Sequence, residues 1–149
     1  MTDHARYSVD DLLYLMRRLR DPVGGCPWDL QQTFASIAPF TLEETCEVID
    51  AIEREDYTQL SEELGDLLFQ VVFHSQLGAD AGLFGFADVV HQIVAKLVER
   101  HPHVFPQGTL HSRRDPAAAE HSLVSIKQTW ESIKQRKRSA KGDAGRLAD

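Results

Sequence analysis

Apolar residues recur at helical spacing along most of the chain, and this periodicity limits the fold more than any other feature. Leu12, Met16 and Leu19 lie three or four residues apart, and so do Leu64 and Leu68. Alternation with a period of two, which is typical of strands, is almost absent. The pattern therefore predicts amphipathic helices. Because four or five such helices with short connections bury their apolar faces on each other, we expect an all-α antiparallel four-helix bundle.

Local signals give approximate helix boundaries. Thr41 and Glu44 form a capping-box pair that would begin the second helix. Asp115 followed by Pro116 is typical of the residues that begin a helix, here the last one. Gly65 inside the third helix costs about 1 kcal/mol relative to alanine, which suggests a close backbone approach at that position. The expected helices span roughly residues 8–21, 41–55, 58–76, 86–101 and 116–138.

The length of 149 residues suits one domain. We expect a single domain over residues 1–138, followed by a flexible charged tail or the start of a linker over residues 139–149. The two cysteines, Cys26 and Cys46, are too few for a disulfide framework. No apolar run approaches the roughly 18 residues typical of a membrane span, and the polar N-terminus does not resemble a signal peptide. These features predict a cytoplasmic protein without a membrane partner.

The net charge of −7 argues against nucleic acid as a partner, since general binding to nucleic acid depends on a basic surface. Much of the negative charge lies in two pairs of acidic residues, Glu44 with Glu47 and Glu63 with Asp66. Residues three apart lie on the same face of a helix, one turn from each other. Because the connection between the two helices is short, we expect them to run antiparallel, with all four carboxylates facing one groove.

The surroundings of these four residues favour a metal site over a solvated acidic face. None has a lysine or arginine three or four residues away, although ordinary exposed faces pair acids with bases at those offsets. Two carboxylates about 4 Å apart repel by roughly 4 kcal/mol at an effective dielectric constant near 20. A domain with a total stability of about 5–15 kcal/mol needs protonation or a bound cation to relieve several such contacts. Oxygen ligands of this kind suit Mg²⁺ or Mn²⁺ better than zinc.

The four residues also resemble the E-x-x-E…E-x-x-D signature of the MazG family, which consists of all-α nucleoside triphosphate pyrophosphohydrolases. The likeness extends over roughly residues 8–137 and is far more specific than E-x-x-E alone. It is carried in family order by residues 19–29, 41–44, 63–72, 100–105 and 130–134.

The resemblance implies a reaction in which a ribo- or deoxyribonucleoside triphosphate and water give the monophosphate and pyrophosphate. The implied cofactor is Mg²⁺, for which Mn²⁺ could substitute, and the implied role is to clean the nucleotide pool. The ligands and catalytic residues would be Glu44, Glu47, Glu63 and Asp66. Two neighbours, Glu43 and Glu62, would assist with substrate and a second ion.

Positive charge for the substrate is implied at Lys96 and Arg100, which match basic family positions and share a helix face. A solvated basic stripe is the alternative for this pair. Trp130 matches a family position near the nucleotide, where its indole would cover a base, although a core role is as well supported. Lys134 lies one turn beyond Trp130 and is a weaker candidate for contact with phosphate.

Several alternatives remain open at this point. The chain could be a nucleotide-binding regulatory domain with little turnover, or a more selective pyrophosphatase of the dUTP or dCTP type. Longer family members carry two copies of the domain, whereas this chain has one, so it could be a natural single-domain form or part of a longer protein. The apolar third helix and the family's habit of dimerising predict a homodimer. The apolar residues concerned are Leu67, Leu68, Phe69, Val71, Val72 and Phe73.

Overall fold

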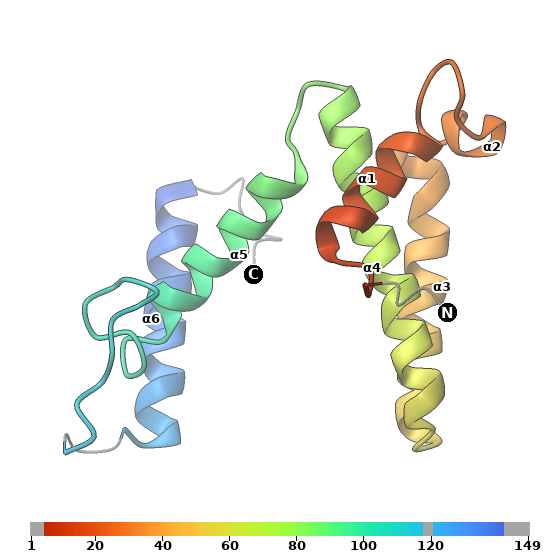
Figure 1. Ribbon diagram of the computed structural model, residues 1–149. Helices are drawn as coiled ribbons and strands as arrows, with labels where there is room; N and C mark the ends of the chain where they lie inside the picture. Colours follow the sequence, from red (N-terminus) through yellow and green to blue (C-terminus); the bar gives the residue numbers. More distant parts are fainter. Residues whose placement is uncertain (1–4, 118–120, 142–149) are drawn as a thin grey trace. The chain divides into compact units, whose positions relative to one another are not determined.

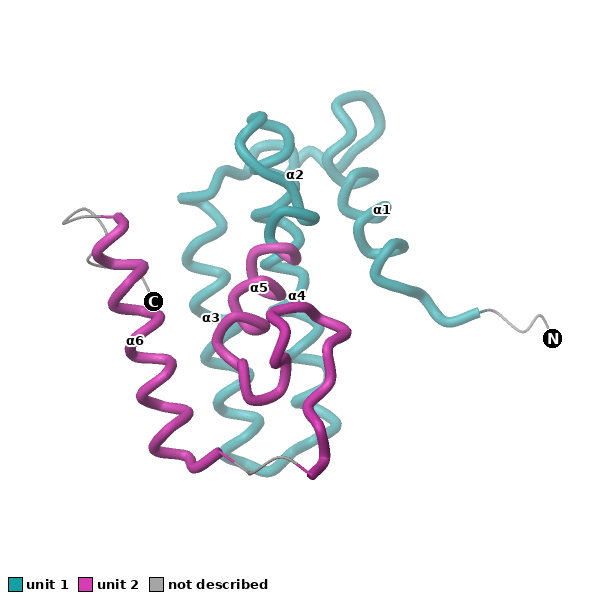
Figure 2. Tube along the Cα trace, turned by 90° about the vertical axis from the view of Figure 1, so that its left-hand side faces the viewer, with its two compact units in different colours: residues 1–89 teal, residues 90–149 magenta. Residues whose placement is uncertain are grey.

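A computed structural model of the chain describes residues 5–117 and 121–141, and every regular element in these ranges is a helix. The expected all-α class is confirmed. No helix in these ranges has both the length and the apolar character needed to cross a membrane. Two compact units divide the chain, residues 1–89 and residues 90–149 (Figure 2). The helices, labelled in Figure 1, are α1 (Val9–Leu19), α2 (Pro27–Leu30), α3 (Phe34–Glu53), α4 (Tyr57–Asp80), α5 (Phe86–Arg100) and α6 (Leu123–Lys141).

The first unit is built on a hairpin of α3 and α4, which lie side by side and run in opposite directions (Figure 1). The connection between them is short and reverses sharply at Glu55, whose φ of 54° is in the left-handed region. Asp56 then caps α4, because its side chain accepts a hydrogen bond from the backbone N–H of Gln59. This tight reversal places the acidic residues of the two helices opposite each other.

The core of the first unit lies where α1 and α3 pack against α4. Its buried residues are Met16, Ile37, Val72, Phe73 and Leu77. Burial of an apolar side chain of this size stabilises the fold by about 1.5–3 kcal/mol. Arg20, just after α1, fixes the edge of this core: its guanidinium donates to the backbone carbonyl of Asp29 and to the carboxylate of Asp80. The α3–α4 hairpin is therefore held by α1 as well as by its own connection.

Helix α3 begins at Phe34, seven residues before the expected start, so that expectation was wrong. The true beginning is a reciprocal cap in which the Thr33 hydroxyl accepts from the Ser36 N–H, and the Ser36 hydroxyl accepts from the Thr33 N–H. Pro39 lies inside the helix and removes one hydrogen bond near its first turns. The cap and the burial of Ile37 outweigh that loss.

In the second unit, the start expected for the last helix was also wrong. Asp115 forms a turn, in which its carboxylate accepts from the Ala117 N–H, and does not cap a helix. Helix α6 begins at Leu123, after Ser122 accepts a hydrogen bond from the Ser125 N–H. It continues to Lys141 and so includes the first three residues of the expected tail. Residues 142–149 of that tail lie outside the described residues, and the expected domain bounds stay a prediction.

Contacts between α5 and α6 hold the second unit together. The ammonium group of Lys137 on α6 lies 3.3 Å from the carboxylate of Glu99 on α5. Val98 of α5 and Ile133 of α6 are both buried. The indole N–H of Trp130 donates to the backbone carbonyl of the last residue of α5. This last bond satisfies one of the carbonyls that a helix leaves unpaired at its C-terminus.

Candidate metal centre

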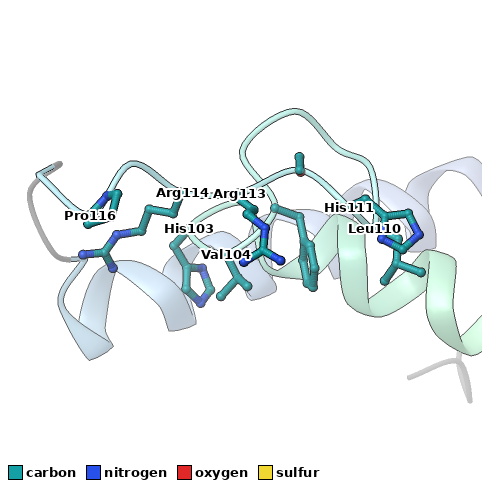
Figure 3. Close-up of a pocket in the computed structure, with 9 residues that line it drawn as sticks. His103, Val104, Leu110, His111, Arg113, Arg114 and Pro116 are labelled. Carbon is teal, nitrogen blue, oxygen red and sulfur yellow. The ribbon is translucent and has the colours of Figure 1, made fainter.

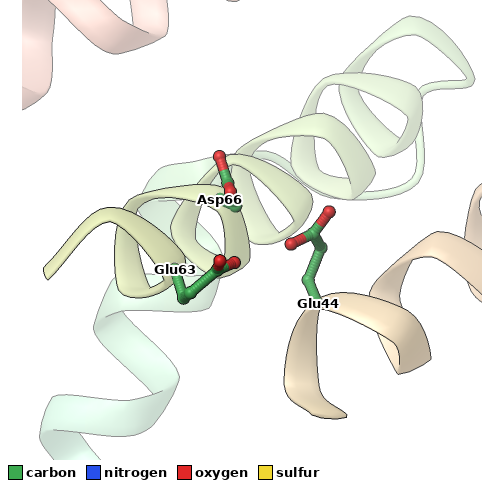
Figure 4. A group of neighbouring side chains, drawn as sticks. All are labelled: Glu44, Glu63 and Asp66. Carbon is green, nitrogen blue, oxygen red and sulfur yellow. The ribbon is translucent and has the colours of Figure 1, made fainter. Parts of the chain in front are cut away.

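Three carboxylates from two helices meet in the first unit (Figure 4). Glu44 extends from α3 toward α4, and Glu63 and Asp66 come from successive turns of α4. One oxygen of each carboxylate lies within 4.8 Å of an oxygen of the other two. Glu63 is buried, Glu44 is half-buried and Asp66 is exposed, so the group opens to solvent on the side of Asp66. The expected convergence of acidic residues across the hairpin is therefore present for these three.

A polar contact between the two helices fixes their register one turn away from the carboxylates. Thr41 precedes Glu44 by three residues, and Gln70 follows Asp66 by four. The Thr41 hydroxyl lies 3.1 Å from the side-chain oxygen of Gln70 and 2.9 Å from Nε2 of His74. Since Gln70 is buried, this contact limits sliding of α3 along α4. It thereby keeps the carboxylate of α3 opposite those of α4.

Gln59 orients the buried carboxylate of the group and was missed in the sequence. Its side-chain amide donates a 2.6 Å hydrogen bond to Oε1 of Glu63. A ligand carboxylate held in this way keeps one orientation, as the hydrogen-bonded ligands of metal sites usually do. The signal was present in the spacing, because Gln59 lies four residues before Glu63 and so on the same helix face.

The negative charges act on one another at short range. Burial raises the pKa of Glu44 above its ordinary value, and the neighbouring carboxylates of Asp66, Glu63, Glu43 and Glu47 raise it further. The repulsion expected from the sequence is thus present around Glu44. A cation bound between these oxygens would remove it. The donor set is all oxygen and strongly anionic, which fits a hard divalent ion such as Mg²⁺.

Glu47 does not belong to the group of three. It lies one turn beyond Glu44 on α3 and is exposed, so the structure brings together three of the four residues expected as ligands. Glu43 on α3 and Glu62 on α4 are exposed and adjoin Glu44 and Glu63 in the chain. These three acidic residues lie near Glu44 or Glu63 in the sequence and are not part of the group of three carboxylates.

The residues expected to bind substrate through positive charge or stacking belong to the second unit. Arg100, Trp130 and Lys134 line one hollow of about 260 Å³. Because the indole N–H of Trp130 is bonded to the carbonyl of Arg100, only the ring surface remains for contact with a ligand. Lys96 lines a different hollow of the same unit. Three of these four residues therefore line the same hollow.

The close backbone approach suggested at Gly65 is not found among the described residues of this chain. A Cβ atom added at Gly65 would meet no described atom within 4 Å, and the residue is exposed. The glycine of α4 that does lie against another group is Gly78, where an added Cβ would come within 2.8 Å of the Phe84 ring.

Comparisons with known proteins identify the family of the chain. Residues 32–105, which include all three carboxylates, match the family model described as the MazG nucleotide pyrophosphohydrolase domain. Over 142 residues the chain is 50% identical to a nucleoside triphosphate pyrophosphohydrolase from Escherichia coli K12. The chain belongs to the MazG family. The match with the E. coli protein covers 95% of this chain but 50% of the relative, so the chain spans about half the length of that MazG protein.

Two proteins from Thermotoga maritima extend the comparison. A nucleoside triphosphate pyrophosphohydrolase/pyrophosphatase MazG is 45% identical over 96 residues, which cover 64% of this chain and 37% of the relative. The crystal structure of a mazG-related protein is similar with a TM-score of 0.65 and 21% identity, covering 85% of this chain and 98% of the other. At that identity the structural likeness shows the fold alone, which agrees with the all-α class.

Proposed function

We propose that the chain hydrolyses nucleoside triphosphates to the monophosphate and pyrophosphate, and that it thereby cleans the nucleotide pool. The observation that carries the proposal is the convergence of Glu44, Glu63 and Asp66 within a MazG domain. Relatives that match most of this chain bear the name nucleoside triphosphate pyrophosphohydrolase. The nucleotide pool lies in the cytoplasm, which is where the proposal places the protein.

The proposed cofactor is Mg²⁺, with Mn²⁺ as a substitute, held by Glu44, Glu63 and Asp66. Such an ion would supply positive charge to stabilise the phosphates and Lewis acidity to activate water. Gln59 keeps the Glu63 carboxylate pointed at the site. Glu47 stays in the proposed ligand set, because its charge already acts on the carboxylate of Glu44.

Glu43 and Glu62 are proposed to assist with a second ion or with the substrate. Their support is their position: each directly precedes a carboxylate of the group in the chain, and both are exposed. Glu43 also contributes to the raised pKa of Glu44, so its negative charge acts on the Glu44 carboxylate.

Three residues that line a hollow of the second unit are proposed as substrate-binding residues. Arg100 and Lys134 would contact phosphates, and the face of Trp130 would stack on the base. The Trp130 N–H is already bonded to a carbonyl. Stacking on its ring would therefore not select one base over another by hydrogen bonding. This favours a broad range of nucleoside triphosphates over a dUTP or dCTP specialist. Lys96 is proposed as a further contact with phosphate.

A homodimer completes the proposal. Leu64, Leu68 and Val71 lie four and three residues apart on α4, and each exposes more than a third of its surface. An exposed apolar face of this kind is typical of a surface that packs against a partner.

Substitution of the carboxylates tests the proposed activity. Glu44→Gln and Asp66→Asn each remove one negative ligand while preserving shape, so we expect pyrophosphate release with Mg²⁺ and ATP to fall by more than about 100-fold. This exceeds the roughly 10–100-fold effect usual for a residue that only supports a ligand. Glu53→Gln, which changes an exposed residue near the end of α3, is the matched control and should keep full activity.

The same assay separates the alternatives. If both variants of the cluster retain wild-type turnover, the acidic group is not the catalytic centre and the proposal fails. If the wild-type chain binds Mg²⁺-ATP saturably yet releases no pyrophosphate, the chain is a nucleotide-binding module and not an enzyme.

A further inference from the structure

An open pocket of about 910 Å³ lies on the second unit, formed by the segment between His103 and Pro116 (Figure 3). It shares no lining residue with the acidic group or with the hollow at Trp130. Most of its lining follows residue 105, where the match to the MazG family model ends. Most of the pocket therefore lies beyond the residues that the family model matches.

Every ionisable residue that lines the pocket is a base: His103, His111, Arg113 and Arg114. Figure 3 shows His103 and Arg113 extending from the same side of the loop. Asp115 is the one acidic residue between positions 103 and 116 and does not line the pocket; its carboxylate accepts from a backbone N–H. Four basic groups thus gather on a chain whose net charge is −7.

Three histidine rings lie close together beside the pocket. The ring of His103 lies 5.3 Å from that of His101 and 5.8 Å from that of His121, between centroids. Burial lowers the pKa of His103, and the neighbouring His101, His121 and Arg114 lower it further. Arg114 therefore adds a positive charge near the ring, which an anion in the pocket would neutralise.

The pocket also offers apolar contacts beside its charges. Val104, Phe105 and Leu110 line it together with the basic residues. Its volume is at the upper end of the roughly 300–1,000 Å³ usual for small-molecule sites, which combine apolar walls with a few polar groups. An aromatic ring such as that of Phe105 can stack on a flat organic group.

We propose that this pocket binds a small organic polyphosphate carrying a planar group, such as a nucleotide, without a metal ion. Arg113 and Arg114 contact the phosphates, because guanidinium groups form paired, charge-assisted hydrogen bonds with phosphate oxygens. Phe105 and Leu110 contact the planar group. The site is independent of the proposed hydrolysis and stands even if the acidic group proves inactive.

The test is an NMR titration of the ¹⁵N-labelled chain with ATP in the presence of EDTA, which withholds any cation from the acidic group. We expect ATP to shift the amide signals of residues 103–117. Arg113→Gln combined with Arg114→Gln should weaken this binding by about tenfold or more, because two charge-assisted contacts are lost.

A double variant with the same change in net charge is the matched control. Arg136→Gln combined with Arg138→Gln removes two exposed arginines of α6 and should leave the affinity unchanged. Inorganic tripolyphosphate, which has the phosphates but no planar group, should bind more weakly than ATP at the same segment.

Three results would overturn the proposal. One is the absence of shifts at residues 103–117 on addition of ATP. Another is equal weakening by both double variants, which would show diffuse attraction to positive charge. The third is equal affinity for tripolyphosphate and ATP, which would exclude the contact with the planar group. Pyrophosphate release is measured in separate samples with Mg²⁺, so loss of activity cannot be mistaken for loss of this site.

Discussion

The carboxylate of Glu44 ionises against burial and against four neighbouring negative charges, which together raise its pKa. A carboxyl whose pKa is higher in the folded than in the unfolded state holds its proton more tightly in the folded protein. Stability is therefore lost as the pH rises from the ordinary carboxyl value through the raised one. The metal-free protein is therefore destabilised by the ionised Glu44, and a bound cation would remove this destabilisation.

Glu44→Gln tests this cost directly. In EDTA at pH 7 the variant should have a higher melting temperature than the wild type, since the glutamine carries no charge. At a pH below about 4, where Glu44 is protonated in both states, the difference should vanish. The measurement is thermal unfolding followed by circular dichroism, with Glu53→Gln as the control. A variant that melts lower than the wild type at both pH values would show that Glu44 is not strained by its neighbours.

The spacing of single residues predicted part of the site. Glu44, Glu63 and Asp66 follow from helical periodicity and a short connection, because both are local properties of the sequence. The hydrogen bond from Gln59 to Glu63 could have been predicted from the same helical spacing. Contact between Thr41 and Gln70 was not, since it depends on how two helices are rotated against each other.

At the scale of the element, α4 contains two glycines in opposite surroundings. Gly65 is exposed, and an added Cβ would meet open space. Gly78 is buried, and an added Cβ would come within 2.8 Å of the Phe84 ring, which itself stacks on Phe34. Substitution of alanine at the two positions should therefore change the free energy of unfolding in opposite directions.

Gly65→Ala should stabilise the protein by about 0.5–1 kcal/mol, because alanine loses less backbone entropy in a helix. Gly78→Ala should destabilise it by about 1–3 kcal/mol, since the Phe84 ring must move. Urea unfolding of each variant measures both effects. In a Phe84→Ala background the clash is gone, and Gly78→Ala should no longer destabilise. Destabilisation by Gly65→Ala would contradict the open surroundings of that residue.

The existence of the five longer helices was predictable, whereas the short α2 and the starts of α3 and α6 were not. The cap formed by Thr33 and Ser36 lies before a proline, and local rules favour a helix start after Pro39. Burial of Ile37 reverses that preference, and burial is a tertiary property. Likewise Asp115-Pro116 has the local form of a helix start, yet the Asp115 carboxylate forms a turn in the structure.

At the scale of the whole molecule, the exposed apolar face of α4 at Leu64, Leu68 and Val71 predicts association. By sedimentation velocity at micromolar concentration we expect the wild-type chain to have the mass of a dimer. Leu68→Glu should shift it to a monomer, because a charge buried in an apolar interface is strongly unfavourable. Val9→Glu, on an exposed position of α1, should leave the dimer intact. A monodisperse wild-type monomer would contradict the proposed homodimer.

In the proposed reaction, the acidic group of this MazG domain directs water to the α-phosphorus of a nucleoside triphosphate. The most direct measurement is product analysis by mass spectrometry after incubation with ATP and Mg²⁺ in ¹⁸O-labelled water. We expect AMP carrying the label, unlabelled pyrophosphate, and no reaction once EDTA is added. ADP with orthophosphate, or label in pyrophosphate in place of AMP, would contradict it, because water would then have attacked a different phosphorus.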